Sequence, residues 1–153
     1  MDDILQENVR DCISDFRDAG IKVWMLTGDK GDTAHQIAFS CGLYSFESNF
    51  KAFFIEDDIG GKNADNLINE MSGLKDEAKY GATISATALV NIMNGDSKDQ
   101  IEKMLNIIQK SRSIVVYRCS PGQKAQITQI VKENLKDSIT LAIGDGANDV
   151  NMI

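Results

Sequence analysis

The sequence has 153 residues, enough for one domain with a substantial core and too few for a large second one. Its 16 Lys and Arg against 23 Asp and Glu give a net charge of −7, which argues against nonspecific nucleic-acid binding, because neutralising phosphates needs clustered basic side chains. Three dispersed cysteines, Cys12, Cys41 and Cys119, favour buried thiols over a disulfide framework or zinc site.

Neither end nor middle of the chain carries a membrane signal. No apolar run reaches the roughly 18 residues of a membrane span. The acidic amino terminus MDDILQENVRD is unlike a signal peptide. We therefore expect the chain as printed to be soluble.

The amino-terminal quarter alternates helical and strand patterns. Apolar residues at helical spacing predict a helix over about residues 4–19, and Gly20 can end it in a left-handed cap. The apolar stretch KVWML predicts a buried strand ending at Thr27. Helical spacing resumes over residues 32–40, and Gly42 closes this second helix.

Residues 46–80 give the weakest pattern. EDDIGGKN indicates a turn, and ADNLINEMSGLKDEAKY is typical of a moderately amphipathic helix. We expect this part to be a variable, insertion-like segment.

The rest of the chain returns to clear alternation. GATIS predicts a strand that leads into a helix near ATALVNIM, and SKDQIEKMLNIIQKS a helix with a Ser cap. IVVYR predicts a strand, SPGQKAQITQIVKENL a helix with proline in its first turn, and SITLAIGDGAND a strand ending in a glycine-rich turn. The alternation predicts a single α/β domain over residues 1–153, with a mostly parallel sheet covered by helices on both faces.

Three polar clusters follow predicted strands: residues 27–30, 121–124 and 144–149. In an open α/β sheet, ligands bind where the carboxyl ends of the strands meet the loops. The spacing excludes two nucleotide motifs, because GDKG does not fit GxxxxGK[ST] and GDGAND lacks the third glycine of a dinucleotide fingerprint.

The last cluster has the chemistry of a magnesium site. Asp145 and Asp149 are four residues apart across a turn, so both carboxylates can face one point and share a cation. The glycines would let backbone N–H groups approach a phosphate, and Asn148 could donate to one of its oxygens. The alternative is an Asp/Asn/Gly turn that caps a helix and binds nothing.

The other two clusters could hold the phosphate. Thr27 offers a hydroxyl and Gly28 an unobstructed amide, although a threonine at this place can also simply cap a helix. Lys124 lies near a helix start, where a cation is disfavoured unless an anion lies beside it; the alternative is a solvated lysine. Lys30 is expected in solvent, the alternative being contact with a nucleotide, and His35 has no evident Ser or Cys partner for catalysis.

Three strings, MLTGDKGDTAHQIAFSCGL, YRCSPGQKAQI and LAIGDGANDVNMI, together resemble the phosphorylation domain of P-type ATPases, membrane pumps with a haloacid-dehalogenase-like fold. Their wording is most similar to the phospholipid-transporting flippase branch. The resemblance covers roughly residues 5–43 and 114–153. It implies that an aspartate takes the γ-phosphoryl group of ATP and is later dephosphorylated, in a cycle coupled to lipid movement.

The resemblance also implies a role for each matching residue. Thr27 and Gly28 would bind the phosphoryl group, with Asp29 near the nucleotide or metal. Lys124 would neutralise the phosphoryl charge, Asp145 would ligate Mg²⁺, and Asp149 with Asn148 would support metal and phosphate.

One departure from the family is large. The nucleophile of the family lies in an Asp-Lys-Thr-Gly-Thr motif, which does not occur between residues 1 and 153. The family places that strand centrally, between the strands that here end at Thr27 and Gly144. We therefore expect a carboxyl-terminal part of the phosphorylation domain, with an incomplete sheet and no activity of its own. The longer protein would use ATP and Mg²⁺ on the cytosolic face of a membrane, take a phospholipid substrate, and could have an accessory subunit.

Two other functions stay open. A small standalone haloacid-dehalogenase-like phosphatase would need a DxD nucleophile after an early strand, whereas Asp2 and Asp3 precede a helix. A flippase-like domain could also serve as a non-catalytic regulatory module of a fusion protein. In addition, Ser85 and Ala86 replace the Ile-Asp-Gly-like turn of the family, which leaves the alignment of residues 46–94 open.

Overall fold

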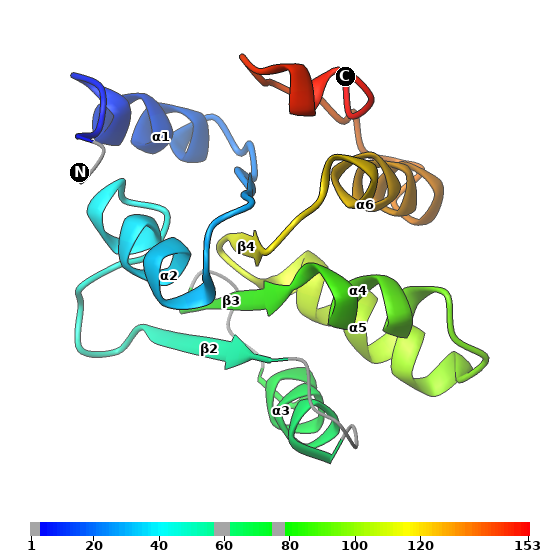
Figure 1. The fold of residues 1–153 in the computed structure, drawn as a ribbon. Helices are drawn as coiled ribbons and strands as arrows, with labels where there is room; N and C mark the ends of the chain where they lie inside the picture. Colours follow the sequence, from blue (N-terminus) through cyan, green and yellow to red (C-terminus); the bar gives the residue numbers. More distant parts are fainter. Residues whose placement is uncertain (1–3, 57–61, 75–78) are drawn as a thin grey trace.

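A four-stranded parallel sheet forms the centre of the computed structural model, which describes residues 4–56, 62–74 and 79–153 (Figure 1). The strand order is β1-β4-β3-β2. The strands are β1 (Met25–Leu26), β2 (Lys51–Ile55), β3 (Tyr80–Ser85) and β4 (Ile114–Tyr117). Because every pair is parallel, the carboxyl ends of all four strands lie at the same edge of the sheet.

Helices cover both faces of the sheet. The helices on one face are α1 (Val9–Asp18) and α2 (Gly31–Ser40), and those on the other are α3 (Lys62–Ser72), α4 (Ala86–Met93), α5 (Lys98–Lys110) and α6 (Pro121–Asn134). The alternation along β4 divides the core: Ile114 and Val116 pack toward α3 to α6, whereas Val115 and Tyr117 pack toward α2. The predicted three-layer α/β fold is confirmed.

Local capping explains why several helices begin where the sequence predicts. The Ser120 hydroxyl accepts from the Gln123 amide at 3.2 Å, and the Gln123 side chain accepts from the Ser120 amide at 3.0 Å, with Pro121 between them. Ser85 and Ser97 likewise accept an amide N–H of the first turn of α4 and α5. These caps fix the start of the helices that follow β3 and β4.

The amino-terminal elements are shorter than predicted: of the buried strand expected over KVWML, only Met25 and Leu26 form β1, and both are half-buried. α1 begins at Val9 rather than near residue 4, because Asn8 has a left-handed backbone with φ 67°. It ends before Gly20, which has the expected left-handed conformation. Cys12 is exposed on α1, contrary to the prediction of a buried thiol, since the inward positions of this helix are Val9 and Ile13. Cys41 and Cys119 are buried as predicted.

The middle of the chain contains a strand that the sequence pattern did not predict, β2, at the edge of the sheet. The predicted helix of this region forms as α3, but it begins at Lys62, inside the predicted turn, and ends at Ser72, whereas Tyr80 belongs to β3. Residues 57–61 of the predicted EDDIGGKN turn, and residues 75–78, lie outside the described residues.

The predicted strand before the glycine-rich turn does not form. Residues 139–143 belong to no helix or strand, and the side chains of Leu141 and Ile143 are 79% and 73% exposed. A strand needs a hydrogen-bonding partner, and within the described residues none lies beside this segment. Strand β1 pairs with β4 and lies at the edge of the sheet. Among the described residues, no helix has the length and apolar content to cross a membrane.

Candidate functional site

The loop after β1 lies against the loop after β4. The Thr27 amide donates to the Val116 carbonyl at 3.0 Å, and the Thr27 carbonyl accepts from the Cys119 amide at 2.9 Å. Two residues further on, the Arg118 amide donates to the Asp29 carbonyl at 2.9 Å. This main-chain ladder fixes residues 27–29 at the carboxyl edge of the sheet, next to the start of α6.

The side chains of this loop show which groups are available. The Thr27 hydroxyl accepts from the Asp29 amide at 3.1 Å and so folds back onto its own loop. Gly28 and Asp29 are exposed. A Cβ at Gly28 would meet only the Cys119 carbonyl oxygen, at 3.6 Å, so the backbone of Gly28 is open.

Arg118, in the loop after β4, has an unusual backbone conformation. It has φ 53°, a left-handed conformation that is uncommon for a residue other than glycine. Its conformation positions the amide that bonds to Asp29.

The strongest contact of the site joins α6 to the glycine-rich turn. Lys124 Nζ donates to Asp149 Oδ1 at 2.7 Å, and both residues are 6% exposed. Asp149 lies in a 3₁₀ turn (Ala147–Asp149). The hydrogen bond from Lys124 holds the pKa of the Asp149 carboxyl below its usual value, against the opposing effect of burial. The lysine near the helix start therefore has a charged partner, and it is not a solvated lysine.

Two glycines let the turn close over Asp149. A Cβ at Gly144 would lie 2.3 Å from Asp149 Cβ, and one at Gly146 would lie 2.3 Å from Asn148 Oδ1. The Gly146 amide donates to Asp149 Oδ2 at 3.4 Å, so both carboxylate oxygens have partners within the protein. Part of the glycine-rich pattern is thus explained by the turn itself, as the alternative interpretation of this cluster held.

The oxygen donors fit Mg²⁺ in part. Asp145 is exposed beside the turn, and Mg²⁺ in proteins usually keeps several waters and takes one or two carboxylates together with substrate phosphates. Asp149 is turned toward Lys124, so its role as a metal ligand stays a prediction. Within the described part of the chain, no group of three or more His, Cys, Asp or Glu side chains is placed to hold a metal ion. Asn148 is exposed at the same turn.

His35 has a structural partnership that the sequence did not indicate. Its Nδ1 lies 2.8 Å from the Thr83 hydroxyl, which lies 2.9 Å from the Tyr44 hydroxyl. Burial lowers the pKa of His35, against the opposing charge of Asp32. His35 and Tyr44 lie 48 and 39 positions from Thr83 in the sequence, so no local spacing pattern could predict this network.

The charge of Asp149 gives a pH prediction. Its folded-state pKa is below the unfolded value, so its contribution to stability is full above the unfolded pKa of about 4 and is lost as the pH falls through the folded pKa. We expect the NMR amide resonances of Gly144 and Gly146 to move toward random-coil chemical shifts as the pH falls through this range. An NMR titration of the wild type and of Asp149→Asn tests this. The variant should lack the transition, and its persistence would assign the transition to another group.

Comparison with known proteins supplies the family. No protein-family model matches the chain. It is 36% identical over 176 residues to the human phospholipid-transporting ATPase IH, 38% over 173 residues to phospholipid-transporting ATPase 10 of Arabidopsis thaliana, and 33% over 172 residues to phospholipid-transporting ATPase dnf2 of Schizosaccharomyces pombe. Each match covers the whole chain but only 15%, 14% and 12% of the respective relative. The chain is thus similar over its whole length to one segment of the phospholipid-transporting ATPases, and its resemblance to the flippase branch of the P-type ATPases is confirmed.

Proposed function

We propose that this chain is the carboxyl-terminal part of the phosphorylation domain of an ATP-driven phospholipid transporter, where it binds Mg²⁺ and the transferred phosphoryl group. One observation carries the proposal: the buried Lys124–Asp149 pair joins the glycine-rich turn to the helix after β4, in a chain whose full length matches phospholipid-transporting ATPases. The phospholipid substrate, the membrane and an accessory subunit belong to the longer protein, and only the names of the relatives support them.

Each group has a role that its surroundings support. The open backbone at Gly28 and the Thr27 hydroxyl would bind phosphoryl oxygens, with Asp29 near the nucleotide or metal. Lys124 would neutralise phosphoryl charge, and Asp149 would hold its ammonium group in place.

The exposed carboxylate of Asp145 would bind Mg²⁺, together with Asp149 if that side chain also reaches the ion, and Asn148 would donate to the phosphate. When bound, Mg²⁺ would stabilise negative charge on the phosphoryl oxygens.

The nucleophile would come from outside the 153 residues. Two features support an incomplete sheet: β1 lies at its edge, and residues 139–143, which belong to no helix or strand, have exposed apolar side chains at alternate positions. A further strand would pair with β1 and supply the reactive aspartate. Without it the isolated chain has no group to phosphorylate.

The isolated chain is therefore expected to bind Mg²⁺ without turning over ATP. Hydrolysis of ATP and of p-nitrophenyl phosphate should stay at the buffer rate with Mg²⁺ present. Mg²⁺ should shift the amide resonances of Gly144 and Gly146 in an NMR titration, and Asp145→Asn should weaken this binding at least about tenfold, since even an outer-sphere partner of a metal is worth about that much. Asp137→Asn, which removes an exposed carboxylate outside the turn, is the matched control.

Different failures would overturn different parts of the proposal. Hydrolysis above the buffer rate that Asp145→Asn abolishes would contradict inactivity and favour the small phosphatase. Mg²⁺ binding that is equally strong in Asp145→Asn would remove the metal assignment. In a longer native form that carries the Asp-Lys-Thr-Gly-Thr motif, ATP labelled at the γ-phosphate should label the protein, and failure to do so would contradict the ATPase itself.

A further inference from the structure

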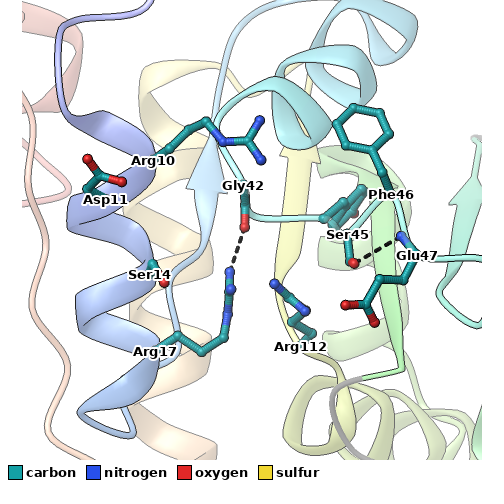
Figure 2. A pocket seen from close by; sticks show the side chains of 10 residues that line it. Arg10, Asp11, Ser14, Arg17, Gly42, Ser45, Phe46, Glu47 and Arg112 are labelled. Carbon is teal, nitrogen blue, oxygen red and sulfur yellow. Dashed lines mark hydrogen bonds between the residues drawn. The ribbon is translucent and has the colours of Figure 1, made fainter.

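A concave site lies at the edge of the sheet opposite to the candidate phosphoryl site. Its cavity of about 530 Å³ is lined by α1, by residues 42–47 between α2 and β2, and by Arg112 (Figure 2). Arg112 precedes β4, whereas Cys119 and α6 follow it, so the cavity and the candidate phosphoryl site lie at opposite ends of the same strand. The cavity therefore forms no part of the site described above.

Arginine is concentrated in this cavity. Three of the four arginines of the chain, Arg10, Arg17 and Arg112, line it, and no lysine of the described residues does. Figure 2 shows their side chains converging around Gly42 from two separate parts of the chain. A guanidinium group presents several N–H donors in a planar fork that matches the oxygens of phosphate and carboxylate groups.

The protein itself uses only some of these donors. Arg17 Nη2 donates to the Gly42 carbonyl at 2.5 Å, and Arg10 Nη1 donates to the Ser40 carbonyl at 3.2 Å. The Nε–H of Arg112 is buried and has no hydrogen-bond partner within the described residues, while its guanidinium lies 5.9 Å from the ring centroid of Phe50. Each guanidinium has five N–H donors, so the arginines have donors left to bind an oxyanion in the cavity.

The charges of the cavity also favour an anion. Besides the arginines, the lining has two acidic residues, Asp11 and Glu47. Burial lowers the pKa of Arg112, and the positive charge of Arg17 lowers it further, against the opposing charge of Glu47. A doubly charged ion between the arginines would relieve this repulsion.

We propose that the cavity binds a small organic phosphate monoester, with its phosphate held by the arginines and its organic part against Phe46. A phosphate monoester carries about −1.5 to −2 charges at neutral pH, more than one carboxylate does. The cavity volume falls within the range of small-molecule sites, which is more room than a bare phosphate ion needs. Phe46 lines the cavity; its ring packs against Phe39 with the centroids 5.1 Å apart, yet the residue is 73% exposed, which leaves ring surface to cover an apolar group.

NMR titration of the chain with phenyl phosphate and with inorganic phosphate, without Mg²⁺, tests the proposal. Phenyl phosphate should shift the amides of Gly42, Ser45 and Arg112, and should bind more tightly than inorganic phosphate. Arg112→Gln should weaken binding at least about tenfold, the usual effect of losing a charged hydrogen bond. Arg10→Gln, on the exposed side of α1, should also weaken the binding of phenyl phosphate. It replaces Arg112→Gln in the test if that variant folds poorly.

The remaining arginine gives the matched control. Arg118 is exposed at the other end of β4, and Arg118→Gln should leave binding unchanged. Phe46→Ala should remove the preference for phenyl phosphate over inorganic phosphate. The proposal is overturned if the shifts are confined to Gly144 and Gly146, if Arg118→Gln weakens binding as much as Arg112→Gln does, or if neither ligand shifts the cavity amides. Equal affinity for the two ligands in the wild type would overturn the organic part of the assignment.

Discussion

Replacing Ile84 by alanine should lower the free energy of unfolding by about 2–5 kcal/mol, the range found for large-to-small changes in protein cores. Ile84 is fully buried in β3, a central strand whose register places it between Ile55 of β2 and Val116 of β4. The alanine would lose the transfer energy of the missing carbons and leave a cavity that the paired strands cannot close. Urea unfolding followed by circular dichroism measures the difference.

The matched control is Ile139→Ala, the same change in the segment that was predicted to be a strand. Ile139 is 103% exposed, so this variant should stay within about 0.5 kcal/mol of the wild type. A loss comparable to that of Ile84→Ala would mean that residues 139–143 pack into a core in solution. The pair of variants thus compares a segment that is paired in the sheet with one that was predicted to be a strand and is not.

The elements with local signals were predictable. The helix after β4 has a serine cap, a proline in the first turn and a reciprocal glutamine within four residues, and it forms as predicted. β3 and β4 are short apolar runs that find partners on both sides. The segment at 139–143 has a similar composition, but pairing depends on a neighbour distant in sequence, and none is among the described residues. An apolar pattern predicts that a segment can pair in a sheet, but it does not show whether a neighbouring strand is present.

The candidate site was predictable in its location and less so in its contacts. The polar residues after β1 and β4 lie at one edge of the sheet, since parallel strands place their ends together, whereas the strand predicted before the third cluster does not form and the roles of the site residues stay predictions. The contact of Lys124 with Asp149 joins residues 25 positions apart, and a spacing pattern cannot show it. The arginine cavity escaped prediction for the same reason, because Arg17 and Arg112 meet only in the fold.

Replacing Thr83 by valine should lower the free energy of unfolding by about 1–3 kcal/mol, because it removes one hydroxyl that two other polar groups use. Thr83 is fully buried, and Tyr44 is 1% exposed. With His35 neutral, as its lowered pKa favours, Nδ1 can accept from the Thr83 hydroxyl while Thr83 accepts from Tyr44, so all three groups are satisfied. Valine keeps the shape of the side chain and leaves both partners without that bond.

Urea unfolding at neutral pH compares Thr83→Val with Thr33→Val, a control at an exposed threonine of α2. The control should stay within about 0.5 kcal/mol of the wild type, as surface substitutions usually do. Tyr44→Phe should lose less than Thr83→Val, because it leaves the bond between Thr83 and His35 in place. If Thr83→Val were as stable as the wild type, the network would have no net effect on stability, and burial alone would hold His35 and Tyr44 against β3.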